Sequence, residues 1–255
     1  HPMSLPAGLR VILAHDWLTG MRGGERVLEE FCQLFPLAPL YTLVHQPGRV
    51  SPVIEDRAIH TSFLQGMPGG VSRYRHYLPL FPLAIERFRL PPCDLVLSSS
   101  HAVAKGIRPP PGALHVSYVH APMRYMWDGF DDYFAPGKAA LPIRVAAHLV
   151  RPGLQRWDRR SAQRVDEIVA NSGYIQQQVQ RCWGRASTVI HPPVSLERFH
   201  PPAPGEPQGD YFLMIGAFAP NKRVADAIQA CNALGLPLRI VGSGQEEARC
   251  RELAG

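Results

Sequence analysis

The sequence predicts an α/β protein built from two doubly wound domains, the second of which is incomplete. Short runs of consecutive apolar residues recur along the chain, as is typical of parallel strands covered on both faces. The first run, at residues 9–15 (LRVILAH), leads into a glycine-containing turn and a helical pattern at 25–34, which is how a doubly wound domain begins. A Pro- and Gly-rich stretch at 199–210 precedes another strand-like run at 211–215, so the pattern starts again.

The first domain, predicted over residues 9–198, contains apolar runs separated by helical or turn-rich stretches. The runs lie at 9–15, 39–44, 95–98, 114–119, 167–170 and 187–190. Apolar residues at helical spacing predict a helix over 25–34, and an Arg-rich stretch predicts a long amphipathic helix over 139–164. We expect the long helix to be broken or kinked near Pro152 and Gly153.

One face of the long predicted helix is strongly basic. It carries Arg144, Arg151, Arg156, Arg159, Arg160 and Arg164. A basic amphipathic helix is compatible with peripheral contact with an anionic membrane. The alternative is an ordinary surface helix packed against the sheet.

The second domain is predicted over residues 211–255 and follows a linker at 199–210. Its pattern is a strand, a polar loop, a helix, a strand and a helix, at 211–215, 217–223, 224–234, 238–241 and 246–253. A parallel sheet of two strands cannot bury both of its faces, so we expect this domain to be incomplete. Residues 1–8 are expected to be an N-terminal extension that includes a tag remnant.

The composition is that of a folded, moderately basic protein. Hydrophobic residues make up 45% and charged residues 19% of the chain, which excludes a disordered protein. The net charge of +6 is dispersed and favours phosphate-bearing partners. Nucleic acid is not expected, because no recognition-helix, zinc-finger or RNP-type pattern is present.

The cysteine pattern argues against a disulfide scaffold and against a zinc site. The five cysteines are widely spaced and form no CxxC pair, which favours a reducing, cytoplasmic compartment. No stretch reaches the ~18–20 apolar residues that a membrane-spanning helix needs. We therefore expect a cytoplasmic protein, with the inner face of the membrane as its only membrane contact.

Chemistry-bearing residues cluster where the predicted strands end, which is where ligands bind in doubly wound folds. Gly23 and Gly24 lie at a strand-to-helix turn that could receive an anion, although a tight turn alone explains such a pair. Asp16 follows the first strand and could bind a ligand or cap a turn. The segment 118–128 (YVHAPMRYMWD) offers an imidazole, a guanidinium and aromatic faces, which suit a sugar ring; a structural loop is the alternative.

Five stretches together carry a family resemblance. They are HDWLTGMRGGERVLE, SSSHAVAKG, YVHAPMRYMWD, VANSGYIQQQV followed by VIHPPVSLERF, and MIGAFAPNKRVADAIQACNALGLPLRIVGSGQE. In this order they resemble the family 4 (group 1) glycosyltransferases of GT-B architecture, and within them the GDP-mannose-dependent mannosyltransferases of bacterial polysaccharide assembly. The resemblance runs from about residue 9 to the end. It implies a complete N-terminal Rossmann-like domain and the first βαβα portion of a second one.

The resemblance also implies a role for each matching residue. His120 would be the catalytic histidine and would hydrogen-bond the transferred sugar. The acceptor and sugar pocket would be shaped by Asp16, Arg124, Tyr125 and Trp127. The donor and its diphosphate would lie along Gly23, Gly24, Lys222, Arg223, Gly242 and Gly244. A metal is not expected, because Lys222 and a helix end would neutralise the diphosphate and no DxD-type motif is visible.

The implied reaction is a retaining transfer of a hexose, expected to be mannose. The donor would be a nucleoside diphosphate sugar, expected to be GDP-mannose, and the acceptor a saccharide or a lipid-linked molecule. Two departures stand out: Ala217 occupies a place where many relatives have Arg, and the paired-glutamate segment of the family would lie beyond Gly255.

Such a fold has two alternative functions. A fragment that binds acceptor without turning over donor is the main alternative. A nicotinamide-dependent oxidoreductase is excluded, because no GxGxxG follows the first strand. The sequence leaves the oligomeric state open.

Overall fold

The computed structural model describes residues 8–137, 139–196, 201–202, 205 and 209–254. The chain divides into two compact units, which are described separately. One unit comprises the chain up to Asp128 together with Pro142–Val194, and the other comprises Gly129–Leu141 and the chain from Ser195 on. The sequence placed 129–141 in the first domain, whereas these residues are grouped with the second unit.

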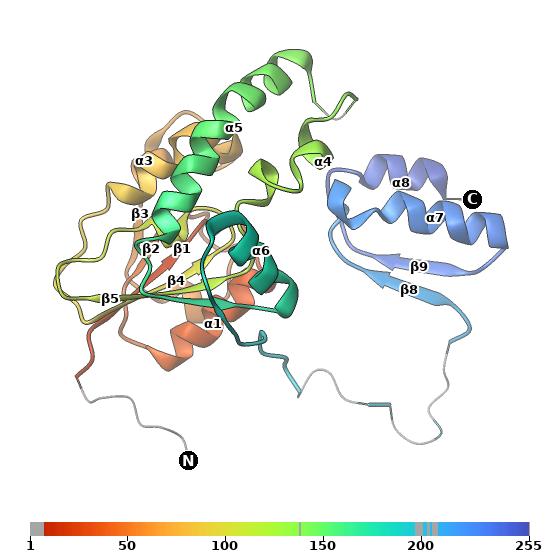
Figure 1. Cartoon of the computed structure of the whole chain (residues 1–255). Coiled ribbons are helices and arrows are strands. Elements are labelled where there is room, and N and C mark those ends of the chain that lie inside the picture. Colours follow the sequence, from red (N-terminus) through yellow and green to blue (C-terminus); the bar gives the residue numbers. More distant parts are fainter. Residues whose placement is uncertain (1–7, 138, 197–200, 203–204, 206–208, 255) are drawn as a thin grey trace. The chain divides into compact units, whose positions relative to one another are not determined.

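The first unit contains a seven-stranded parallel sheet with the order β3-β2-β1-β4-β5-β6-β7 (Figure 1). Its strands are β1 (Val11–His15), β2 (Leu40–Thr42), β3 (Ile59–Thr61), β4 (Leu95–Ser100), β5 (Leu114–Val119), β6 (Glu167–Ala170) and β7 (Thr188–Val189). Its α-helices are α1 (Gly23–Leu34), α2 (Pro52–Glu55), α3 (Phe81–Glu86), most of α5 (Leu141–Ala162) and α6 (Gly173–Trp183). Its 3-10 helices are η1 (Phe63–Gly66), η2 (Tyr74–Leu80), η3 (Ala104–Gly106) and η4 (Arg124–Met126).

The sheet is covered on both faces, which explains why its strands read as continuous apolar runs. One core cluster packs Leu28 and Cys32 of α1 against Leu13 and Leu97 of the sheet. A second cluster on the other face packs α6 and the end of α5 against β5 and β6. The doubly wound α/β fold predicted for this part of the chain is confirmed.

Helix α5 differs from its prediction in one respect. It is a single helix over Leu141–Ala162 with Pro152 inside it, so a break there is wrong, and a kink at Pro152 stays a prediction. A proline removes one backbone hydrogen bond. Because Pro152 is exposed, the carbonyl that loses this bond can be hydrated, and the buried face keeps Ala147 and Leu154 in place.

The second unit contains the predicted βαβα portion. Its elements are α4 (Phe130–Phe134), β8 (Phe212–Ile215), η5 (Pro220–Lys222), α7 (Val224–Leu234), β9 (Leu238–Val241) and α8 (Glu247–Leu253). The two strands pair in parallel, and a small core forms where α7 and α8 cover one face of the pair. Side chains that point to the other face, Leu213, Ile215 and Val241, are exposed.

No helix in the described part of the chain combines the length and the apolar character needed to cross a bilayer.

Candidate functional site

The candidate site lies at the carboxyl ends of β1, β4 and β5, where the order of the strands reverses. The register pairs His15 with Ser99 across β1 and β4. His101 directly follows β4, and His120 directly follows β5. Three imidazoles from distant parts of the sequence therefore meet at the switch point of the sheet, the usual position of ligands in doubly wound folds.

The hydroxyl of Ser99 joins two of these imidazoles. Its Oγ lies 3.1 Å from Nδ1 of His15 and 2.9 Å from Nε2 of His120. His15 and Ser99 are fully buried, whereas His120 is partly exposed. His120 is therefore the member of this group that a ligand can reach.

The glycine pair brings the first turn of α1 to the same place. The helix begins at Gly23, and a Cβ atom on Gly24 would lie 3.6 Å from Nε2 of His120 and 3.6 Å from Cε1 of His15. The open backbone N–H groups at a helix N-terminus attract anions. The structure thus places Gly24 beside His120, and the phosphate-binding role of Gly23 and Gly24 stays a prediction.

Asp16 caps the turn that follows β4. Its carboxylate accepts hydrogen bonds from the backbone N–H groups of residues 101–104, at 2.6 to 3.0 Å, and its Oδ2 lies 3.1 Å from Nδ1 of His101. Because the side chain is fully buried and both oxygens are engaged, Asp16 has the turn-capping role, one of the two that its position after the first strand allows. Its position lends no support to an acceptor contact.

The buried charges around His120 have shifted pKa values. Burial is the main cause that lowers the pKa of His120 to about 3, and the neighbouring His101 and His15 act in the same direction. Burial acts to raise the pKa of Asp16, but His101, His15 and the backbone N–H groups outweigh it, so the net pKa is lowered. The same holds for Glu25, where His15 outweighs burial. Near neutral pH the site therefore has two ionised carboxylates and a neutral His120.

The segment after β5 divides into exposed and structural residues. Arg124 is exposed and Tyr125 is partly buried, so both remain candidates for contact with a ligand. Trp127 instead donates a hydrogen bond from its Nε1 to Oδ2 of Asp158, at 2.8 Å. Its indole N–H is engaged within the fold and the guanidinium of Arg159 lies over its ring at 5.1 Å, so the pocket role of Trp127 stays a prediction.

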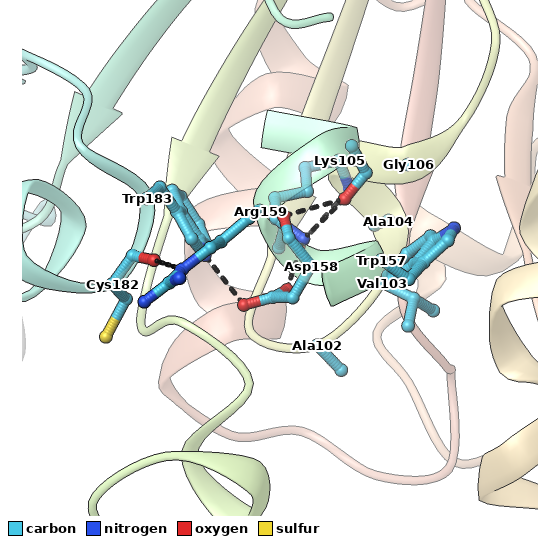
Figure 2. A network of polar contacts seen from close by, with 12 residues as sticks. Ala102, Val103, Ala104, Lys105, Gly106, Trp157, Asp158, Arg159, Cys182 and Trp183 are labelled. Carbon is cyan, nitrogen blue, oxygen red and sulfur yellow. Dashed lines mark hydrogen bonds and ion pairs between the residues drawn. The ribbon is translucent and has the colours of Figure 1, made fainter. Parts of the chain in front are cut away.

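Asp158 is the centre of a buried polar network that holds two of the site's loops (Figure 2). Lys105 contacts Oδ1 of Asp158 through its Nζ at 2.6 Å, and Nε1 of Trp183 donates to Oδ2 at 2.6 Å. The ammonium group also lies 4.9 Å from the ring centre of Trp157, within the range of a cation–π contact. Because Lys105 belongs to the turn after β4 and Trp127 to the segment after β5, the network ties both to α5.

The remaining predicted residues lie in the second unit. Lys222 and Arg223 are exposed immediately before α7. Arg223 is the non-glycine residue with a positive φ (52°) in the described part of the chain, and it pairs with Asp226 at 2.6 Å. A polar hollow of about 320 Å³ beside it is also lined by Glu246 and Arg249.

Gly242 and Gly244 have a structural reason to be glycine. A Cβ atom on Gly242 would lie 1.8 Å from the carbonyl oxygen of Gly216, and one on Gly244 would lie 2.6 Å from that of Phe218. Both glycines therefore let the loop after β9 approach the loop after β8. This close approach explains their identity without reference to a ligand, and their predicted contact with the donor remains a prediction.

Three residues of the site were not singled out from the sequence: Ser99, His101 and Glu25. The signal that could have found them is their position at strand and helix ends. Ser99 and His101 belong to SSSHAVAKG, and Glu25 follows the glycine pair. Their importance depends on β1 lying next to β4, which local patterns do not reveal.

No protein-family model and no curated protein matches this sequence. Two solved structures of Alr3699/HepE from Anabaena are similar to it in the path of the backbone. The complex with UDP is 11% identical, with a TM-score of 0.49, and the complex with UDP-glucose is 14% identical, with a TM-score of 0.48. Each similarity covers 96% of this chain and 72% of the other.

Proposed function

We propose that this chain is a nucleotide-sugar-dependent glycosyltransferase that transfers a hexose to a saccharide or lipid-linked acceptor. The observation that carries the proposal is a neutral, partly exposed His120 beside Gly24 at the start of α1. The imidazole can hydrogen-bond a sugar hydroxyl, and the helix N-terminus can receive a phosphate. These are the two chemical parts of a nucleoside diphosphate sugar.

The proposed reaction retains the configuration at the anomeric carbon. The bond from this carbon to the diphosphate oxygen breaks, the bond to the acceptor oxygen forms, and the acceptor proton passes to the departing phosphate. No enzyme nucleophile is needed. The buried carboxylates near His120 support this, because Asp16 is held by four N–H groups and Glu25 accepts from the N–H of Arg22 at 3.1 Å. A glycosidase would need two available carboxyl groups.

We assign the diphosphate of the donor to Lys222 and Arg223. The exposed ammonium and guanidinium groups precede α7, whose N-terminus also favours an anion. The left-handed backbone at Arg223 is costly for a non-glycine residue, and such strain is often associated with binding sites. Fixed positive charge of this kind stabilises a leaving diphosphate, and we propose that no metal ion is required.

The donor that we propose is GDP-mannose. This choice rests on the resemblance of the five motif stretches, and in particular on YVHAPMRYMWD. The described residues contain no contact that would distinguish guanine from another base, so nucleotide preference is a direct test of this choice.

We also propose that α5 brings the protein to an anionic membrane surface. Val145 and Leu149 lie one turn apart on the helix and are 49% and 76% exposed, and Arg156 and Arg160 continue the same face. Apolar and basic side chains on one exposed face suit the boundary of an anionic bilayer. Sedimentation with vesicles containing phosphatidylglycerol should recover the wild-type chain but not Leu149→Glu; equal recovery of both would contradict this contact.

Calorimetry tests the donor assignment and separates the enzyme from an acceptor-binding module. GDP-mannose and GDP should both bind the 255-residue chain, and Lys222→Ala should bind them more weakly. Arg251→Ala is a matched control, since Arg251 is an exposed basic residue that pairs with Glu247 on α8. If neither nucleotide binds, the donor site is absent and acceptor binding is the function that remains for this chain.

A further inference from the structure

The hydroxyl of Ser99 is placed to decide which nitrogen of His120 carries a proton. Its Oγ lies within hydrogen-bond distance of Nδ1 of His15 and Nε2 of His120. A hydroxyl has one hydrogen, so it donates to one of these nitrogens and accepts from the other. The protonation of His15 therefore determines that of His120 through a single shared group.

Glu25 gives this chain of hydrogen bonds a direction. Its Oε1 lies 3.7 Å from Nε2 of His15, and the carboxylate is buried at the start of α1. A proton on Nε2 of His15 faces this negative charge favourably, whereas a lone pair there would be repelled. In its neutral form, His15 thus carries its proton on Nε2, and its Nδ1 accepts the hydrogen of Ser99.

We propose that Glu25, His15 and Ser99 are positioning residues that hold neutral His120 with its proton on Nε2 and its Nδ1 as a free acceptor. With its hydrogen given to His15, Ser99 can only accept from His120. No described residue forms a hydrogen bond with Nδ1 of His120, so this nitrogen is available to a ligand. The other charged or titratable groups acting on His120 are His101 and Asp16, which contact each other.

The tautomer selects the chemical class that His120 can bind. A lone pair on Nδ1 accepts a hydrogen bond from a hydroxyl group and repels an ionised phosphate oxygen. Phosphate is therefore directed to the backbone N–H groups at Gly23 and Gly24, and a hydroxyl of the sugar or acceptor is directed to His120. This assignment of ligand groups rests on the proposed function, whereas the tautomer does not.

Nuclear magnetic resonance of the 255-residue chain labelled with ¹⁵N-histidine tests the tautomer directly. Long-range proton–nitrogen correlations distinguish a protonated from an unprotonated ring nitrogen, and His120→Gln assigns the resonances. We expect Nε2 of His120 to be protonated at neutral pH. Ser99→Ala should change the nitrogen shifts of His120 towards a mixture of tautomers, and Ser99→Thr, which restores the hydroxyl, should return them.

A matched control is Ser72→Ala, because Ser72 is exposed and belongs to no part of this chain of hydrogen bonds. Protonation of His120 on Nδ1 in the wild type, or unchanged His120 shifts in Ser99→Ala, would overturn the proposal. The spectra need no substrate. An Nε2–H tautomer in a chain that binds no nucleotide sugar would contradict the proposed function alone.

Discussion

A methyl side chain at Gly24 would occupy the space beside His120. Its Cβ atom would stand at ordinary van der Waals distance from His120 and His15, so the fold should tolerate Gly24→Ala. The methyl group would block the approach of a ligand to the helix N-terminus. We expect an unchanged melting temperature and a large loss of nucleotide-sugar affinity, measured by calorimetry.

Gly23→Ala is the matched control for this change, because nothing lies within 4 Å of a Cβ atom there. It should keep both the fold and more of the affinity. Unfolding of Gly24→Ala, or full affinity in that variant, would show that the glycine does not serve ligand approach.

Asp16 is expected to matter for stability through its four backbone hydrogen bonds. In Asp16→Asn one oxygen becomes an NH₂ group that faces two N–H donors. Loss of charge-assisted hydrogen bonds in a buried place should cost about 3 kcal/mol of the free energy of unfolding, measured by urea denaturation.

Asp94→Asn provides the comparison, because Asp94 forms an exposed pair with Arg10. Exposed pairs contribute about 0–1 kcal/mol. A cost for Asp16→Asn as small as that for Asp94→Asn would contradict the capping role.

The residues of the site could be predicted from the sequence only in part. His120, Gly23 and Gly24 follow predicted strands and belong to recognisable stretches, and the structure brings His120 and Gly24 together. Ser99 could not be identified as their link, because it pairs with His15 from 84 positions away. That pairing depends on the strand order, which no local pattern contains.

Among the helices and strands, the buried strands are the ones that the sequence pattern predicts. Strand β1 is buried on both faces and produces an unmistakable apolar run. Strand β3 has three residues, Ile59–Thr61, none of which is buried, and it was not predicted. Helix α5 was predicted but not its continuity, because a proline on the exposed side of a helix removes a hydrogen bond that water can replace.

The close approach of two loops in the second unit gives a prediction for β8 and β9. In Gly242→Ala the methyl group would overlap the carbonyl oxygen of Gly216 at 1.8 Å, so the backbone must move. We expect loss of the protection of amide protons in β8, β9 and α7 from hydrogen exchange.

The partner position supplies the control. No atom lies within 4 Å of a Cβ atom added at Gly216. The amide protons of β8, β9 and α7 should therefore stay protected from hydrogen exchange in Gly216→Ala. Protected amides in Gly242→Ala would show that the loop can accept a side chain.

At the scale of the whole molecule, buried neutral histidines should make the fold sensitive to acid. Burial lowers the pKa of His115 to about 4, while the unfolded chain has the ordinary value near 6.5. Between these values the unfolded state binds more protons, so stability falls as the pH falls from about 6.5 to about 4, by up to about 1.4 kcal/mol per pH unit for each such group. His120 acts in the same direction.

Urea unfolding followed from about pH 7 to about pH 5 measures this effect. In the wild type the hydroxyl of Ser98 lies 2.9 Å from Nε2 of His115. The glutamine in His115→Gln can still hydrogen-bond this hydroxyl, but it cannot titrate. The variant should lose less stability than the wild type over the same interval. Identical pH dependence in both would mean that His115 is not the group responsible.

We propose that this chain transfers a sugar from a nucleoside diphosphate donor at the site that contains His120. Release of GDP from GDP-mannose, followed with a mixture of saccharide and lipid-linked acceptors, tests it most directly in the wild type, His120→Ala and the exposed control His76→Ala. We expect acceptor-dependent release in the wild type and in His76→Ala, and a loss of several orders of magnitude in His120→Ala with the fold intact. Equal release by all three variants, or none by the wild type with any nucleotide sugar, would contradict it.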